Sequence, residues 1–240
     1  MRGYVSAYDA GSGKLKWRFF TVPGDPAKGA PEDKAMEAAL KTWGPKTDWA
    51  SGLGGTVWGE MTYDPELNLL YVGTGNSTPY AGWHRDPSRG ENLYLVSILA
   101  IDPSNGALKW HYQMVHHDIW DYDNATAPKL LTVKHDGKTV DIVAQVTKQG
   151  YIFVFDRMSG QPLFPIEEIP APASALNGEI AWATQPVPAR FQLEQVPENF
   201  AEQRRALALI NELPLVVEMR SRFGTQGFHN PTLRLFALRK

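Results

Sequence analysis

The stretch Ala7-Tyr-Asp9-Ala-Gly-Ser-Gly13-Lys-Leu-Lys-Trp17 decides the fold, because the chain repeats it. A second copy reads Ala100-Ile-Asp102-Pro-Ser-Asn-Gly106-Ala-Leu-Lys-Trp110. A third copy reads Val154-Phe-Asp156-Arg-Met-Ser-Gly160-Gln-Pro-Leu-Phe164, with Phe in place of Trp. The shared pattern is apolar-x-Asp-x-x-x-Gly-x-x-x-aromatic.

This pattern predicts a strand, a tight turn and a return strand. The Asp side chain can bond the turn backbone, the Gly supplies a positive φ, and the aromatic residue packs on the return strand. The copies lie 93 and 54 residues apart, counted from Asp to Asp. A β-propeller blade takes roughly 40–50 residues. We therefore expect an all-β partial propeller, with two blades from the first copy to the second and one blade to the third.

Other segments predict the elements between the copies. Strand patterns occupy residues 61–73, 142–146 and 151–155, and a short helix is expected at 34–41 within a Pro-rich insertion. Residues 165–188 are rich in Pro and Ala and are predicted to be irregular. We assign 1–190 to the partial propeller and 191–240 to an irregular, partly helical tail, in which Asn199 and Glu202 form a capping box.

Composition supports a turn-rich β protein. The chain has 43% hydrophobic residues, eight Trp, 21 Gly and 18 Pro. A net charge of −2 gives no electrostatic footprint for nucleic acid. The absence of Cys excludes thiolate metal sites and catalytic thiols within this chain. No apolar run reaches membrane-span length and no signal peptide is recognisable; the chain starts directly on a strand pattern, as expected for part of a longer protein.

The segment His116-His-Asp-Ile-Trp-Asp-Tyr-Asp123 concentrates acids and aromatics directly after a strand pattern. In an extended chain, His116 and His117 point to opposite faces, so both are not expected to bind one metal ion. Asp121 and Asp123, at i and i+2, share a face. Two carboxylates on one face favour a hard, calcium-like cation over zinc, although a turn with solvated aspartates has the same pattern.

Three further residues are candidates, each with a plainer interpretation. Trp58 follows the adjacent glycines Gly54 and Gly55 and offers a flat ring for stacking, or it is a buried Trp beside a turn. Asn76 ends a strand, where its amide oxygen suits a hard cation, or it is an ordinary turn residue. Lys148 lies in a predicted turn between two strands, where it can contact an anionic oxygen or remain solvated.

Five motifs in this order resemble the pyrroloquinoline quinone (PQQ)-dependent alcohol, methanol and glucose dehydrogenases, which are eight-bladed propellers with a tryptophan-docking repeat. The resemblance covers residues 1–190. The motifs are Arg2-Gly-Tyr-Val-Ser-Ala-Tyr-Asp9, Gly54-Gly-Thr-Val-Trp58, Tyr63-Asp-Pro-Glu-Leu-Asn-Leu-Leu-Tyr-Val-Gly-Thr-Gly-Asn76, Trp120-Asp-Tyr-Asp123 and Lys148-Gln-Gly-Tyr-Ile-Phe-Val-Phe-Asp-Arg157.

The resemblance implies a role for each candidate. Trp58 forms the floor on which PQQ stacks, and Thr56 and Lys148 hydrogen-bond the cofactor. Asn76 ligates the metal ion. Asp121 is the general base that takes the hydroxyl proton as hydride passes to PQQ, and it also belongs to the metal site.

According to the same resemblance, Asp123 does not decide which metal ion binds. An acid at this place accompanies lanthanide in the methanol-dehydrogenase branch, and it also occurs in the glucose-dehydrogenase-like branch. Calcium is the expected ion and a lanthanide is the alternative.

The resemblance further implies an alcohol or sugar substrate, a periplasmic location, and cytochrome c or a membrane quinone as electron acceptor. The chain departs from the family pattern in lacking the upstream Glu ligand and about half of the blades. A half-ring exposes sheet edges and does not enclose PQQ, which argues against activity of this stretch alone.

Two other functions stay open on the residues alone. A propeller can be a non-catalytic module that binds proteins. A propeller glycosidase could use Asp118 and Asp121 as paired carboxylates. The presence of Trp58, Asn76 and Asp121 together favours the dehydrogenase.

Overall fold

The computed structural model describes residues 1–189; the capping box and helix expected from Asn199 onward lie outside them. The described part divides into a main unit, residues 1–131 and 142–189, and the outer part of one hairpin, residues 132–141. Within the described residues, no helix is both long and apolar enough to cross a bilayer.

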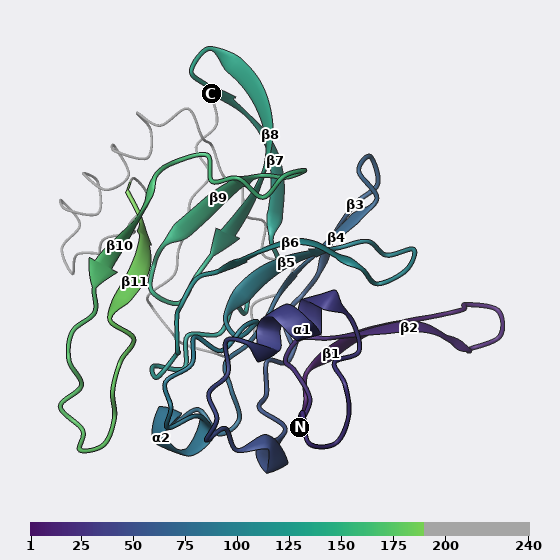
Figure 1. The fold of residues 1–240 in the computed structure, drawn as a ribbon. Coiled ribbons are helices and arrows are strands. Elements are labelled where there is room, and N and C mark those ends of the chain that lie inside the picture. Colours follow the sequence, from purple (N-terminus) through teal and green to yellow (C-terminus); the bar gives the residue numbers. More distant parts are fainter. Residues whose placement is uncertain (190–240) are drawn as a thin grey trace, which may run out of the picture. The chain divides into compact units, whose positions relative to one another are not determined.

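Strands make up most of the regular secondary structure of the described residues, which confirms the predicted all-β class (Figure 1). The strands are β1 (Tyr4–Tyr8), β2 (Leu15–Phe20), β3 (Thr62–Asp64), β4 (Leu69–Gly73), β5 (Ser97–Ile101), β6 (Leu108–Gln113), β7 (Lys129–His135), β8 (Lys138–Val146), β9 (Ile152–Asp156), β10 (Ile166–Pro170) and β11 (Thr184–Pro188). The helices are α1 (Lys34–Leu40), the 3-10 turn η1 (Trp49–Ser51) and α2 (Gly82–Arg85).

The strands form four sheets in chain order. The sheet β3-β4-β5-β6 is an antiparallel meander, as expected for one propeller blade. The sheet before it holds β1 and β2, and the sheet after it has the order β7-β8-β9. Strands β10 and β11 pair antiparallel. The prediction of an irregular segment at 165–188 is therefore wrong at its two ends, which form β10 and β11, and correct for residues 171–183, which have no helix or strand.

All three copies of the repeat form the predicted turn. The Asp Oδ1 of each copy accepts a backbone N–H from a Ser, and the Gly has a positive φ. The turns join β1 to β2, join β5 to β6, and follow β9. The accepting residues are Asp9 (from Ser12, 2.9 Å), Asp102 (from Ser104, 2.9 Å) and Asp156 (from Ser159, 2.7 Å).

Each repeat tryptophan docks on the turn of the next sheet. The Trp17 indole N–H donates to the carbonyl oxygen of Pro103 at 2.8 Å, and a Cβ on Gly106 would lie 2.7 Å from the Trp17 ring. Trp110 donates to the carbonyl of Arg157 at 3.3 Å and covers Gly160 in the same way. The glycine therefore serves two needs, the left-handed backbone and the space for the ring.

This docking corrects the predicted blade count. Trp17 in β2 contacts the β5–β6 turn, so the first and second copies are one blade apart rather than two. The extra length lies in irregular segments: residues 21–61 carry α1 and η1, and residues 74–96 carry α2. Loop insertions of this kind leave the strand topology intact, which is why the residue spacing overestimated the number of blades.

The central blade is covered on both faces. On one face, Val72 of β4 and Leu99 of β5 pack in one core cluster with α1 and with residues of β1 and β2. On the other, Tyr71 and Ile98 pack against β8 and β9. Neighbouring residues of one strand thus pack on opposite faces of the sheet, because successive side chains of a strand point to opposite faces. Helix α1 confirms the predicted helix at 34–41 and is capped by the Asp33 side chain.

Candidate functional site

Three predicted site residues from distant parts of the chain converge. Asn76 follows the end of β4, Asp121 follows β6, and Lys148 lies in the turn between β8 and β9. The Asn76 side-chain amide donates to the Asp121 carboxylate. Lys148 Nζ donates to the Asp121 carbonyl oxygen at 2.7 Å and lies 3.6 Å from the Asp121 carboxylate. The segments that follow β4, β6 and β8 therefore bring an amide, a carboxylate and an ammonium group into one place.

Asp123 joins these segments. Its Oδ1 accepts the backbone N–H of Asn76 at 2.7 Å, and its Oδ2 accepts a hydrogen bond from Lys148 Nζ at 2.9 Å. Its side chain is only 11% exposed. Both oxygens are thus engaged with protein groups, and a cation bound by Asp123 would share these oxygens with Asn76 or Lys148.

Asp121 is the open carboxylate of the site. Its side chain is 58% exposed, and its φ of +64° lies in the left-handed region, which is uncommon for residues other than glycine. The segment is therefore a turn rather than the extended chain expected from the i, i+2 spacing. The two aspartates still reach one site, because Lys148 contacts both.

Lys148 is held in its charged form. Burial lowers the pKa of this amine, but the hydrogen bond and charge of Asp123, together with the charge of Asp121, outweigh burial and raise the pKa. The site therefore contains a fixed ammonium group that can donate to a ligand oxygen.

The glycine segment before Trp58 packs closely against the Asn76 strand end. Gly54 and Gly55 have φ values of +75° and +68°, and a Cβ on Gly54 would lie 2.5 Å from a backbone nitrogen. Gly55 donates to the Asn76 carbonyl at 2.8 Å, and the Thr56 carbonyl accepts from Gly75 at 2.9 Å. Only glycine permits this approach, which sets Thr56 and the residues after it beside Asn76.

Trp58 presents its ring to solvent at this place. The residue is 59% exposed, which excludes the interpretation of a buried Trp beside a turn. A Cβ on Gly75 would lie 3.2 Å from the Trp58 Nε1 atom, so the indole borders the strand end that carries Asn76. An exposed indole next to polar groups is a stacking surface for a planar ligand.

The first half of the 116–123 segment is largely buried. Asp118 is 1% exposed and accepts the backbone N–H groups of Trp120 at 3.0 Å and Tyr122 at 3.1 Å. These two hydrogen bonds and the charge of Arg85 lower the pKa of Asp118, but burial outweighs them and raises it. Because Asp118 is enclosed, the pair of Asp118 and Asp121 does not flank an open cleft as a glycosidase requires.

The two histidines have separate surroundings, as predicted. The His117 ring packs beside Gly82 with Nδ1 2.7 Å from the Gly90 carbonyl, and burial lowers its pKa to about 4. The His116 ring contacts Glu91 at 3.0 Å and Glu168 at 3.1 Å. Burial opposes protonation of His116, but these two carboxylates outweigh it and raise its pKa.

Sequence reasoning missed Arg85. This residue ends α2 and is fully buried, although it stands among polar residues in a loop-rich segment. No spacing or motif marks it, and its burial is visible only in three dimensions.

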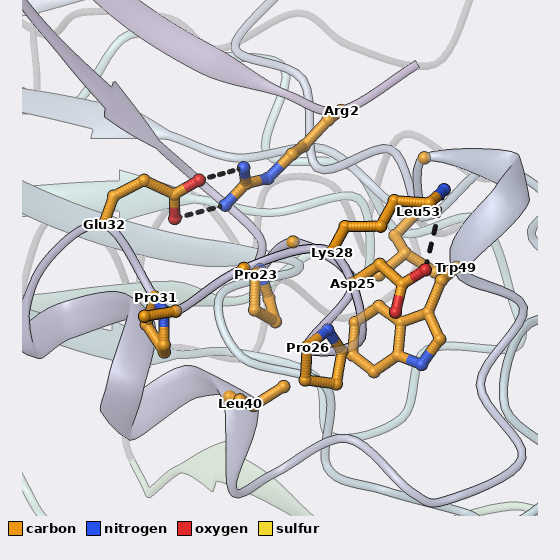
Figure 2. A pocket seen from close by; sticks show the side chains of 14 residues that line it. Arg2, Pro23, Asp25, Pro26, Lys28, Pro31, Glu32, Leu40, Trp49 and Leu53 are labelled. Atoms are coloured by element: carbon orange, nitrogen blue, oxygen red, sulfur yellow. Dashed lines mark hydrogen bonds and ion pairs between the residues drawn. The ribbon is translucent and has the colours of Figure 1, made fainter.

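A cavity of about 420 Å³ lies apart from these residues, between the loop 23–32 and Trp49 (Figure 2). Arg2 and Glu32 pair across two hydrogen bonds at its edge, of 2.5 and 2.9 Å. None of the predicted site residues lines this cavity. The convergence of Asn76, Asp121 and Lys148 is therefore the better candidate site, although it is an open surface.

Residues 1–231 match the family described as PQQ: glucose/ethanol/alcohol dehydrogenase, beta-propeller domain. The chain belongs to this family. The match confirms the resemblance and the partial propeller that the repeat predicted.

Two quinohemoprotein alcohol dehydrogenases are similar to this chain in sequence. The chain is 48% identical over 162 residues to the enzyme of Comamonas testosteroni, which covers 67% of this chain and 23% of the relative. It is 48% identical over 183 residues to ADH IIB of Pseudomonas putida, which covers 76% and 25%. The chain thus spans about a quarter of the length of these relatives.

Solved structures agree with the sequence match. The Comamonas testosteroni enzyme superposes with a TM-score of 0.67 at 41% identity, over 78% of this chain and 28% of that one. A europium-containing methanol dehydrogenase gives a TM-score of 0.58 at 29% identity, over 78% and 33%.

The residues present fit one side of a PQQ and metal site. Asn76 and the exposed Asp121 offer oxygen-bearing groups side by side, which suits a hard cation, and the exposed Trp58 ring offers a face for a planar quinone. Within residues 1–189, no group of three His, Asp or Glu side chains could hold a metal ion.

Proposed function

We propose that the full-length protein containing this chain oxidises an alcohol in a PQQ- and metal-dependent reaction, and that Asn76, Asp121 and Lys148 form one side of its active site. The observation that carries the proposal is their convergence beside the exposed Trp58 in a chain of this family. Similar proteins carry the name quinohemoprotein alcohol dehydrogenase, which favours an alcohol over a sugar.

Asp121 is the general base of the proposed reaction. Its carboxylate is exposed, so a substrate hydroxyl can approach it, and Asn76 and Lys148 fix its position from two sides. It accepts the hydroxyl proton as the alcohol is oxidised.

The other residues hold and orient the cofactors. Trp58 offers its ring as a stacking surface, Thr56 lies in the same segment, and Lys148 directs its N–H groups towards the site. When bound, PQQ supplies the electron acceptor and the metal ion supplies Lewis-acid polarisation. The protein contributes position, charge and a base.

Asn76, Asp121 and Asp123 are the proposed metal ligands from this chain, with calcium as the expected ion. A lanthanide is the alternative, because one similar structure is a europium-containing methanol dehydrogenase. The Asp123 oxygens already accept hydrogen bonds from the Asn76 backbone and from Lys148, so a metal ion bound by Asp123 would share an oxygen with one of these donors.

The proposed electron acceptor is a cytochrome c or a membrane quinone, and the proposed location is the periplasm. Relatives include an alcohol dehydrogenase (quinone) of Acetobacter aceti and a lupanine 17-hydroxylase [cytochrome c] of a Pseudomonas species, so both acceptor classes occur among them.

The test is reduction of an artificial electron acceptor by full-length protein loaded with PQQ and either calcium or a lanthanide. Alcohols are expected to support turnover better than sugars. Asp121→Asn is expected to lower turnover at least 1000-fold while PQQ stays bound, because the base is lost and the stacking surface is not. Full activity of this variant would exclude Asp121 as the base.

A further inference from the structure

The hairpin of β10 and β11 contacts the 116–123 segment at its first residue, His116. The His116 backbone N–H donates to Gln185 Oε1 at 2.9 Å, and Gln185 Nε2 donates to the His116 carbonyl at 2.8 Å. The Trp182 ring lies 6.0 Å from the His116 ring, measured between centroids. The side chains of Gln185 and Trp182 carry no charge at any pH, so this attachment does not depend on protons.

The His116 side chain makes a second attachment, to the other strand of the hairpin. Its Nε2 atom lies 3.1 Å from a carboxylate oxygen of Glu168 in β10. Its Nδ1 atom lies 3.0 Å from a carboxylate oxygen of Glu91 and 2.9 Å from Gln113 Oε1. The His116 side chain is only 14% exposed. One imidazole thus lies between a carboxylate of the hairpin and a carboxylate of the loop before β5.

These contacts require a proton on both ring nitrogens. Gln113 directs its Nε2 group to three backbone carbonyl oxygens, at 3.1, 3.4 and 3.2 Å, so its Oε1 atom faces His116 as an acceptor. The side-chain atoms that the two ring nitrogens contact, on Gln113, Glu91 and Glu168, are therefore all acceptors. A neutral imidazole has one N–H, whereas an imidazolium has two.

A neutral His116 ring would keep one of these attachments and lose the other. Nδ1 has two acceptors, on Glu91 and Gln113, while Nε2 has Glu168. The tautomer with its proton on Nδ1 therefore keeps more hydrogen bonds, and it turns the Nε2 lone pair towards the Glu168 carboxylate. Loss of the Nε2 proton breaks the contact with the hairpin and leaves the contacts with Glu91 and Gln113 in place.

We propose that His116 is a proton-dependent clamp: with both ring nitrogens protonated it holds the hairpin β10–β11 on the start of the 116–123 segment, and loss of the Nε2 proton to solvent loosens the hairpin. The hairpin loop contributes Gly178 and Ile180 to a small pocket that Trp83 of α2 also lines. The clamp therefore also determines how firmly the hairpin loop lies against α2. It does not depend on the proposed reaction.

The charged neighbours of the clamp decide the pH range in which it opens. Burial lowers the pKa of His116, but the hydrogen bonds and charges of Glu91 and Glu168 outweigh burial and raise it. His111 lies near Glu91, and burial lowers its pKa; Tyr112 lies near Glu168, and burial raises its pKa. Both of these groups are therefore neutral from about pH 7 to 9. The clamp is complete below the ordinary His pKa of about 6.5 and opens as the pH rises through the raised pKa of His116.

Amide hydrogen exchange in the full-length protein without PQQ or metal tests the clamp. Protection factors are compared, because they correct for the intrinsic effect of pH on exchange. Those of residues 166–188 are expected to fall at least about fivefold from pH 6 to pH 9, since the proton that holds Glu168 is lost. Amides of β5 report the global fold and are expected to keep their protection. No fall in the hairpin, or an equal fall in β5, would overturn the proposal.

Two substitutions in β10 form a matched variant and control. Glu168→Gln is expected to remove the fall, because an amide can accept from the protonated ring or donate to the neutral ring. Glu167→Gln makes the same change one residue earlier, where the side chain points to the opposite face of the hairpin, and is expected to keep the fall. Both positions are exposed, so both variants are expected to fold. A fall that persists in Glu168→Gln would overturn the proposal.

His116→Gln tests the imidazole itself. This variant does not titrate, so the protection factors of the hairpin are expected to be equal at the two pH values. A fall as large as in the unsubstituted protein would show that another group controls the hairpin. If His116→Gln does not fold, the comparison of Glu168→Gln with Glu167→Gln still decides. Because no cofactor is present in these measurements, their outcome is separate from that of the turnover test of the proposed function.

Discussion

Individual residues of the candidate site fall into an exposed group, to which we assign the chemistry, and an enclosed group that lies close to it in the sequence or the fold. Asp121 and Trp58 are open to solvent, while Asp118 and Arg85 have almost no exposed surface. The sequence motifs pointed to the exposed residues, because a carboxylate and an indole are side chains that can bind or react with a ligand. The enclosed residues were less visible: Asp118 stood within the acidic cluster, but Arg85 had no pattern around it.

The buried His117 predicts how stability depends on pH. Its pKa is lowered to about 4 in the folded chain, so the unfolded chain binds its proton more readily below the ordinary value of 6.5. Its contribution to stability is therefore present above pH 6.5 and is lost as the pH falls towards 4, by up to about 3 kcal/mol.

Urea unfolding at pH 7, 5.5 and 4 measures this effect. The unsubstituted protein is expected to lose more stability over this interval than His117→Gln, because Gln does not titrate. Equal losses in the two proteins would show that His117 is not responsible. A different interval belongs to His116: its pKa is raised, so its contribution is complete below 6.5 and declines as the pH rises above that.

At the level of strands and turns, the repeat correctly predicted each turn and the one-blade step from the second copy to the third. The predicted two-blade step from the first copy to the second is wrong. The turn depends on the local residues Asp and Gly, which a sequence displays directly. Blade spacing depends on how much loop is inserted between strands, and loop length is weakly constrained. The strands β10 and β11 were missed because Pro170 and Pro186 argue against strands, although a two-stranded pair has free edges where proline is tolerated.

The repeat glycines give a matched pair of substitutions. Gly13 and Gly106 occupy the same repeat position with φ values of +68° and +80°. A Cβ on Gly13 meets no atom within 4 Å, while a Cβ on Gly106 meets the Trp17 ring at 2.7 Å. Gly13→Ala is expected to cost about 1–2 kcal/mol from backbone strain alone. Gly106→Ala is expected to cost about 1–3 kcal/mol more, because the ring must move.

Chemical denaturation of the two variants decides whether docking adds to stability. A larger loss for Gly106→Ala supports tryptophan docking as a contribution beyond the turn itself. Equal losses would mean that the Trp17 ring gives way at no cost and that the contact is not tightly packed.

For the whole molecule, the described residues contain one complete four-stranded blade and the residues that we propose as one side of the active site. We expect the 240-residue chain by itself to bind PQQ weakly and to show no turnover, because the ligands it offers do not surround a cofactor. Tryptophan fluorescence during PQQ titration, compared with the full-length protein, measures this. Equal affinity in the two would show that this chain holds the complete binding site.

The docking of each tryptophan also sets an order of events during synthesis. Trp17 precedes its acceptor Pro103 by 86 residues, and Trp110 precedes Arg157 by 47. A ribosome adding roughly 5–20 residues per second needs about 4–17 s to deliver the first acceptor after its donor. During that time the Trp17 indole has no acceptor to dock on. Docking of each tryptophan therefore becomes possible only after the turn of the next blade has been synthesised.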